Sequence, residues 1–447
     1  MLGQSRVENL AKRALRLSQA GETEVLVQTE DTSLTRFANN AVHQNVSETE
    51  ARVTIRAVVG NRAGSASTND LEDGALARAA ALALTTARLR PEDRNFPGLA
   101  EPLPIQPVQA FDERTANFSP EARARGVSAV CALAAERKLN AFGAFRTTAF
   151  EHAVANSKGV FAYHRGTAAD FQTVVMGADG SGRAQVSSWK VGELDGEAMG
   201  REAVGKALRA QDPRKIEPGE YTVVVDHYVT DDLLGMLNFY GMSAEAVQEG
   251  RSWINDRINQ QAMSRNVSIW DDGQDRDGMP LPFDSEGTPR QRVQIVDNGV
   301  ICGPVYDRYT AAKEGRESTG HATPPVFVFF TGPMAFNLFM AGGDSSVEEM
   351  IRSTRKGLYI TRFWYTRLVH PRDCVVTGMT RDGLYMIEDG ELAYPVKNLR
   401  FTQSYVKALA GVQAVGSEAR TLIHDFAGAA HVPALKLESF NFTSSTV

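Results

Sequence analysis

Apolar residues recur at two different spacings along the first ninety residues of the chain. Between residues 7 and 17 they return every third or fourth position, which predicts an amphipathic helix. Between residues 51 and 59 they alternate with polar residues, which is the spacing of a half-buried strand. Further elements are predicted at 24–28 (strand), 62–68 (strand, after a Gly60-Asn61 turn) and 71–89 (alanine-rich helix). The pattern indicates a small sheet with helices on one side.

The middle of the chain changes from a proline-rich connection to a meander of strands. Five prolines fall between residues 91 and 110, which predicts an extended linker. Ser119 followed by Pro120 predicts a helix start, because the hydroxyl caps the first turn and proline suits the first helical position. Residues 140–189 alternate and turn repeatedly, which predicts an antiparallel meander. A helix at 196–210 and a boundary near residue 215 follow.

Beyond residue 215 the pattern favours short strands separated by Gly, Pro and Asp turns. A helix over 230–240 is an exception, with Thr230 or Asp231 as its N-cap. Other short elements are expected at 221–225, 326–330, 344–353 (a helix capped by Ser345 or Ser346), 357–363, 383–387 and 391–394.

We therefore predict an α+β protein, with an N-terminal α/β region of antiparallel sheet and flanking helices followed by a β-rich C-terminal domain. The expected regions are 1–100 (N-terminal α/β), 101–214 (central α/β with the meander) and 215–447 (β-rich).

Composition narrows the class of partner. The 48 Lys and Arg against 54 Asp and Glu leave a net charge of −6, so the chain lacks the basic excess that neutralises nucleic-acid phosphates or an anionic membrane. The three cysteines have no paired spacing, which favours a reducing compartment. The start is too polar for a signal peptide, and no apolar window is long enough to span a membrane. We expect a cytoplasmic protein without nucleic-acid or membrane partners.

The stretch from Phe283 to Ala322 is dense in glycine turns and polar residues. The side chains most suited to chemistry there are Asp284, Glu286, Asp307 and His321. Together they offer a general base and an orienting carboxylate, and polar loops are a frequent place for function. The same loop is also interpretable as a structural connection. Both interpretations stay open at this point.

Common catalytic motifs are missing from the chain. No His is followed by Glu, so HExxH and HExxxH helices are absent, as are the GxSxG elbow and the phosphate loop. Looser groups are a thiol–base pair at His370, Asp373 and Cys374, a histidine pair at His424 and His431, and an acidic loop at 271–277. A nucleophilic Cys374 has little support, because catalytic partners usually come from separate segments; the histidine pair is interpreted as surface residues and the acidic loop as solvated.

Three stretches resemble the TldD/PmbA (TldE) family. They are L-T-R-F-A-N-N-A-V-H-Q at 34–44, F-D-S-E-G-T-P through S-T-G-H-A at 283–322, and I-E-D-G-E-L-A-Y-P-V at 387–396. The resemblance extends over nearly the whole chain. It implies an N-terminal α/β region, a central region and a β-rich C-terminal domain. It also implies kinship with zinc peptidases of the TldD branch, which clear short or unfolded peptides and process some peptide precursors.

The zinc site of the TldD branch is not reproduced in this sequence. In that branch an HExxxH helix follows a strand, here the one at 221–225, and a cysteine near the C-terminus completes the site. Gly235, Met236 and Tyr240 stand at the helix positions, and Val415 stands at the cysteine position. None of the four supplies an imidazole or thiolate ligand, or a carboxylate base.

The sequence thus looks like the PmbA/TldE branch, the non-metal subunit of a two-subunit peptidase. The resemblance implies a TldD-type zinc subunit as partner in a heterodimer, peptides as substrate, and no cofactor on this chain, with zinc only on the partner. Two alternatives remain: an independent metal-free hydrolase built around the four polar residues of 283–322, and a homodimer that only binds peptides.

Overall fold

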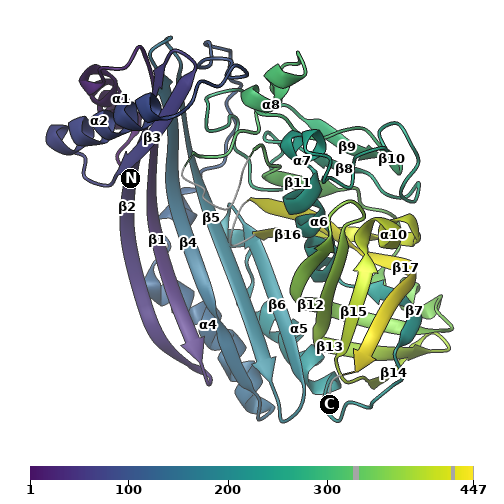
Figure 1. The fold of residues 1–447 in the computed structure, drawn as a ribbon. Helices are drawn as coiled ribbons and strands as arrows, with labels where there is room; N and C mark the ends of the chain where they lie inside the picture. The colour runs from purple at the N-terminus through teal and green to yellow at the C-terminus, as the bar shows by residue number, and fades with distance from the viewer. Residues whose placement is uncertain (326–331, 424–427, 446–447) are drawn as a thin grey trace.

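The computed structural model describes residues 1–325, 332–423 and 428–445, and it divides the strands between two sheets (Figure 1). The first sheet has six strands in the order β3-β2-β1-β4-β5-β6, and every pair is antiparallel. Its strands are β1 (Glu22–Ala38), β2 (Ala41–Val59), β3 (Arg62–Thr68), β4 (Asn140–Asn156), β5 (Phe161–Met176) and β6 (Ser181–Ser188). The first two predicted regions therefore share one sheet, and the division of the chain into three domains stays a prediction.

Four helices cover one face of this six-stranded sheet. They are α1 (Gln4–Leu17), α2 (Asp73–Leu89), α4 (Pro120–Glu136) and α5 (Gly196–Arg209); α3 (Glu113–Ala116) and the 3₁₀ turn η1 (Val191–Glu193) are short connections. One apolar cluster joins α1 and α2 to the strands, and a second joins α4 and α5. Ser119 caps α4 by accepting from the Ala122 N–H, as predicted. The opposite face of the sheet carries polar residues and contacts the C-terminal half.

Strands β1 and β2 are much longer than their sequence patterns suggest. The predicted strand 24–28 covers only part of β1, and β2 begins ten residues before the predicted start at residue 51. The first part of β2 is almost wholly exposed and pairs only with β1. In this part the two strands are held together by backbone hydrogen bonds, and their side chains are polar and solvated. The sequence therefore shows no alternation of apolar residues that would predict a strand.

The second sheet has eleven strands and closes on itself. Its strands are β7 (Gly219–Val225), β8 (Ile269–Asp271), β9 (Val293–Asp297), β10 (Val300–Ile301), β11 (Asn337–Met340), β12 (Lys356–His370), β13 (Val375–Glu388), β14 (Glu391–Pro395), β15 (Leu399–Ser404), β16 (Val412–Ile423) and β17 (Ala429–Ser445). Strand β17 pairs with β15 and with β7, so that β7, β12, β13, β15 and β17 form a ring. Phe363, Phe401 and Phe440 pack together in its core.

Helix α6 (His227–Gly241) packs against strands β12 and β17 of this ring. It begins earlier than predicted, because Asp226 caps it by accepting from the His227 N–H; Thr230 and Asp231 lie inside the helix. The remaining helices are α7 (Ala244–Gln248), α8 (Arg308–Lys313), α9 (Val347–Arg352) and α10 (Tyr405–Ala410).

The predicted helix at 344–353 is α9, and Ser346 is its cap. The turns at Asp389-Gly390 and Asn298-Gly299 each connect two paired antiparallel strands. The predicted strand at 326–330 lies outside the described residues. Within the described ranges, no helix is both long enough and apolar enough to cross a membrane.

Candidate functional site

Asp284 holds two loops of the 283–322 stretch together. Its fully buried carboxylate accepts from the backbone N–H groups of Glu286, Thr288 and Ala322, each at 2.9 Å. Burial and the neighbouring Glu286 carboxylate raise the pKa of Asp284. In a turn, such hydrogen bonds to a side-chain carboxylate satisfy backbone N–H groups that a helix or sheet would otherwise pair. Asp284 therefore fixes the loop and brings it beside His321.

Glu286 connects the same loop to the six-stranded sheet. Its carboxylate accepts from Arg56 Nη1 on β2 at 3.1 Å and from the Arg308 N–H at 3.4 Å. Arg56 also reaches Glu24 on β1, at 3.4 Å between Nη1 and Oε1. Asp307, the residue before Arg308, is the N-cap of α8 and accepts from the Thr310 N–H at 2.8 Å. Both acidic residues are thus engaged in binding neighbouring segments.

His321 forms a buried pair with Asp271. Its Nε2 lies 2.8 Å from Asp271 Oδ1, its Nδ1 lies 2.9 Å from Thr319 Oγ1, and the second Asp271 oxygen accepts from the Asn337 N–H at 2.7 Å. Burial alone would raise the pKa of Asp271, but His321 and these hydrogen bonds lower it. The interpretation of Asp271 as part of a solvated acidic loop is wrong, because it lies in β8 with no exposed surface.

The four predicted residues thus follow one connected path through the loop without meeting at one point. Asp284 reaches the residue after His321, and Glu286 reaches the residue after Asp307. Each side chain is already bonded to a neighbouring segment. None of the four lines the pocket described below. The arrangement is that of residues that build a loop.

The positions where the sequence resemblance implies a zinc site lie on α6 and β16. Gly235, Met236 and Tyr240 are half-buried on α6, and Val415 is buried on β16. Their side chains offer no imidazole, thiolate or carboxylate, so the residues present do not fit a zinc ion.

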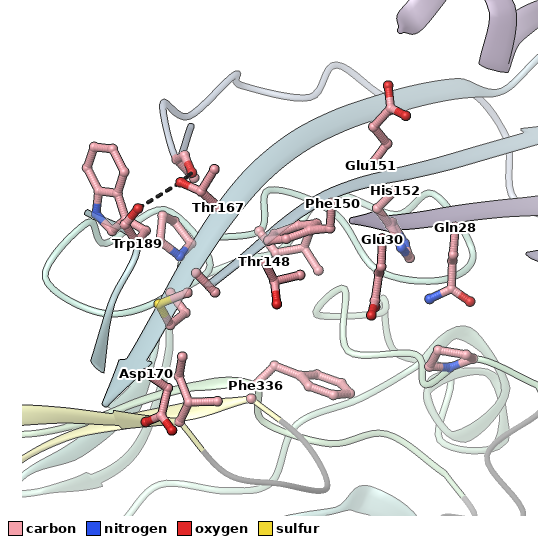
Figure 2. Close-up of a pocket in the computed structure, with 18 of the residues that line it drawn as sticks. Gln28, Glu30, Thr148, Phe150, Glu151, His152, Thr167, Asp170, Trp189 and Phe336 are labelled. Carbon is pink, nitrogen blue, oxygen red and sulfur yellow. Dashed lines mark hydrogen bonds between the residues drawn. The ribbon is translucent and has the colours of Figure 1, made fainter. Parts of the chain in front are cut away.

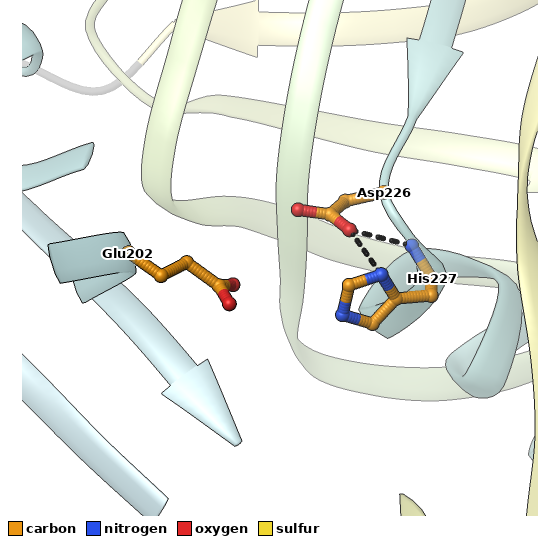
Figure 3. A group of neighbouring side chains, drawn as sticks. All are labelled: Glu202, Asp226 and His227. Atoms are coloured by element: carbon orange, nitrogen blue, oxygen red, sulfur yellow. Dashed lines mark hydrogen bonds and ion pairs between the residues drawn. The ribbon is translucent and has the colours of Figure 1, made fainter. Parts of the chain in front are cut away.

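A second polar cluster lies at the start of the same helix and joins it to α5 (Figure 3). Ligand atoms of Glu202, Asp226 and His227 lie within 4.8 Å of one another. The Lys206 ammonium donates to Glu202 Oε1 and to Asp226 Oδ2, both at 2.7 Å, and so stands where a metal would bind. Burial alone would lower the pKa of Lys206, but the two carboxylates raise it well above its usual value.

Further donors complete this cluster. His227 Nδ1 lies 2.6 Å from Asp226 Oδ1, and the Tyr359 hydroxyl donates to Asp226 Oδ2 at 3.1 Å. Arg420 Nη1 donates to Glu202 Oε2 at 2.9 Å. The cluster is an ion-pair network that ties the central helix α5 to the C-terminal half. The sequence analysis missed it, because its members are scattered over more than two hundred residues without a shared spacing.

Cys374 is not a ready nucleophile, and of the histidine pair only His431 lies in the described part of the chain. Burial raises the pKa of the Cys374 thiol to about 12, and the thiol is fully buried, so it is not a ready thiolate. His370 lies 3.7 Å from Asp373 at the surface. His431 Nδ1 is 2.8 Å from Thr421 Oγ1, whereas His424 lies outside the described residues.

A pocket of about 340 Å³ lies between the polar face of the six-stranded sheet and loops of the C-terminal half (Figure 2). Gln28 and Glu30 on β1 and Thr148 on β4 point from the sheet toward Phe336 on the opposite wall. The pocket also contains Arg290, a residue that the sequence analysis did not select. Nothing in the sequence around Arg290 marks it as different from its neighbour Arg292.

Three family profiles match the chain in order. They describe PmbA/TldA metallopeptidase domain 1 over residues 23–87, the central domain over 116–211 and the C-terminal domain over 218–444. The last match alone spans more than half of the 447 residues. The chain belongs to the PmbA/TldD family. The resemblance seen in the sequence is thereby confirmed.

Relatives within the PmbA/TldD family are distant. Metalloprotease PmbA of Escherichia coli O157:H7 is 25% identical over 397 residues, which are 84% of this chain and 83% of that protein. A metalloprotease of Methanothermobacter thermautotrophicus is 26% identical over 226 residues, so the match spans about half of each chain, 51% of this one and 49% of that one. The crystal structure of TldE from Thermococcus kodakarensis superposes with a TM-score of 0.87 at 20% identity, covering 98% of this chain and 99% of that one. At that identity the likeness concerns the fold.

Proposed function

We propose that this chain is the non-metal, TldE-like subunit of a two-subunit peptidase, and that zinc is held by a TldD-type partner. One observation carries the proposal. By the resemblance drawn from the sequence, α6 is the helix that bears the HExxxH motif in the TldD branch, and Gly235, Met236 and Tyr240 stand at the motif positions. A chain that keeps the fold and the helix without the ligands is suited to complete a partner's peptide-binding chamber.

The surface beside α6 supports an interaction role. Large apolar side chains are exposed on α6 and on the adjoining strand β12, and arginines stack on two of them, Trp364 and Tyr365. The exposed fractions are 40% for Phe239, 42% for Trp364, 67% for Tyr365 and 58% for Val369. Aromatic and arginine side chains are enriched where proteins bind one another. We place the partner contact on this surface.

The alternative of an independent metal-free hydrolase has less support. A general base needs a carboxylate or imidazole free to reach a substrate. Asp284 and Asp307 accept from backbone N–H groups, and His321 is enclosed with Asp271. These bonds commit the residues to holding the loop.

The proposal is tested by measuring zinc content and peptidase activity on one purified sample, alone and after mixing with a TldD-type subunit that has an intact HExxxH. We expect no stoichiometric zinc and no activity alone, and activity on mixing. About one zinc per chain would contradict the proposal, as would hydrolysis by the isolated chain. A stable homodimer that ignores the TldD-type subunit would favour the peptide-binding alternative.

The interface is tested with a matched pair of variants. Trp364→Ala combined with Tyr365→Ala should weaken complex formation at least tenfold in analytical ultracentrifugation, because buried aromatic anchors dominate interfaces. Leu89→Ala removes a large apolar side chain that is even more exposed, 82% on α2, and should leave the complex unchanged. Equal affinities for all three proteins would place the contact elsewhere.

A further inference from the structure

The pocket between the six-stranded sheet and the C-terminal half is lined by a buried arginine, two of whose nitrogens have no hydrogen-bond partner among the described residues. Arg290 is 6% exposed, and its Nε and Nη1 atoms have no hydrogen-bond partner among the described residues. The guanidinium lies 4.7 Å from the ring centroid of Phe336, which is part of the pocket wall. Buried donors are nearly always bonded in a folded protein, and an exception calls for a physical reason.

The carboxylates nearest Arg290 are already engaged. Asp271 binds His321 and the Asn337 N–H, and Asp284 binds three backbone N–H groups. Neither forms an ion pair with Arg290 within the part of the chain that the structure describes. The guanidinium is therefore left with two unbonded nitrogens in the wall of the cavity, and arginine is a preferred partner of a carboxylate.

The other residues that line the pocket indicate what kind of molecule the carboxylate belongs to. Phe150, Leu281 and Phe336 give the wall an apolar character, and about 340 Å³ is enough for a small ligand. The sheet side adds Gln28 and Glu30, whose oxygens are able to accept from amide N–H groups. Asp170, also in the lining, is occupied by Gln185 and Ser187, so it does not compete for Arg290.

We propose that this pocket binds the C-terminal residue of a short peptide, with the terminal carboxylate on Arg290 and the apolar side chain against Phe150 and Phe336. The inference rests on the proposed function in one respect, namely that peptides are what this protein handles. It adds a defined subsite on the non-metal chain and a preference for free, apolar C-termini. The ligand would supply the hydrogen bonds that the fold leaves unmade.

Isothermal titration calorimetry on the isolated wild-type chain is the primary test. The probes are N-acetyl-leucyl-leucine and its C-terminal amide. We expect the free acid to bind at least tenfold more tightly than the amide, because only the acid offers a carboxylate to Arg290. Equal affinities, or no binding by either probe at millimolar concentration, would overturn the proposal without any variant being needed.

A third probe distinguishes a peptide from a simple acid. The compound 4-methylpentanoate carries the same apolar group and carboxylate without an amide. We expect it to bind at least tenfold more weakly than the dipeptide, since it leaves Gln28 and Glu30 without a partner. Affinity equal to that of the dipeptide would mean that the pocket takes small carboxylic acids, and the peptide assignment would fail.

Two arginine variants provide the matched comparison. Arg290→Met keeps an unbranched stem in the cavity and should weaken binding of the free acid at least tenfold, so that acid and amide bind alike. Arg292→Met removes an arginine two residues away, half-exposed and stacked on Trp270, and should bind as the wild type does. Undiminished binding by a folded Arg290→Met protein would contradict the role of Arg290.

The result is separable from the proposed function. Complex formation with a TldD-type subunit without dipeptide binding would remove the pocket assignment alone. Dipeptide binding by a chain that forms no such complex would keep the pocket and remove the partner role.

Discussion

Lys206 and Arg290 are buried cations of the same chain in opposite circumstances. Lys206 donates to two carboxylates at 2.7 Å, and both carboxylates have further donors around them. Arg290 is more deeply buried than Lys206, and it stacks on Phe336 with two nitrogens unbonded. Burial of a charge is costly in both cases. The charge of Lys206 is neutralised by carboxylates of the protein itself, whereas the charge of Arg290 is left for a bound ligand to neutralise.

The difference comes from where the nearby acids are used. Asp226 stands at the N-cap of α6, where it neutralises Lys206 and caps the helix at once. Asp284 accepts hydrogen bonds from backbone N–H groups and Asp271 is bonded to His321, so neither carboxylate pairs with Arg290. Because the carboxylates of this loop hold the loop itself together, the neighbouring arginine stays available for a ligand.

Removal of Lys206 should have the largest effect. In Lys206→Met the Asp226 and Glu202 carboxylates lose their shared cation, so the free energy of unfolding should fall by about 3–5 kcal/mol. Urea unfolding followed by circular dichroism measures this loss. Lys190→Met is the control, because its ion pair with Glu193 at 3.2 Å is exposed and contributes at most about 1 kcal/mol. Equal losses in both variants would mean that Lys206 is not the centre of the network.

Asp232 on α6 tests an intermediate case, a buried acid held by hydroxyls. Tyr405 and Thr366 donate to it at 2.7 and 2.8 Å, and burial raises its pKa to about 6. Well below about pH 4 the carboxyl is protonated in both the folded and the unfolded state. As the pH rises from about 4 to about 6, only the unfolded state releases the proton, so stability falls by about 3 kcal/mol across this window.

Asp232→Asn cannot ionise and should lack this part of the pH dependence. The measurement is the urea midpoint of both proteins at several pH values between 4 and 7. Other buried acids contribute equally to the two proteins, so the difference between the curves isolates Asp232. Parallel curves would show that the carboxyl does not titrate in this range.

Arg290→Met should change stability least, by less than about 1 kcal/mol. Loss of stacking on Phe336 is offset by removal of unbonded donors from the interior. Thermal unfolding of wild type and variant without ligand gives the comparison. A loss as large as that of Lys206→Met would mean that the fold itself satisfies Arg290, which would end the contrast between the two cations.

Local signals in the sequence were enough to predict much of the fold. The cap at Ser119, the helix capped by Ser345 or Ser346 and the strand at 62–68 each depend on a few adjacent residues, and each is confirmed. The start of α6 was misplaced, because Thr230 and Asp231 are as good caps by type as Asp226, and only the position of β7 decides among them.

The site was harder to predict, for a physical reason. Asp271 and His321 are fifty residues apart, and the sequence gives no sign that they pair. The loop residues Asp284, Glu286 and Asp307 were selected for their types, yet their role depends on which N–H groups surround them. Arg290 was missed altogether, because what distinguishes it is an absence of partners in three dimensions.

The ring of the C-terminal half has a consequence for the order in which the protein is made. Strand β17 closes the ring by pairing with β7 and β15, and it is synthesised after both of them. The six-stranded sheet ends at Ser188 and is able to form while the remainder is still being synthesised. Until Ser445 has emerged, β7 lacks its antiparallel neighbour and the phenylalanine core stays exposed. Premature termination within β17 should therefore yield a folded first half attached to an aggregation-prone second half.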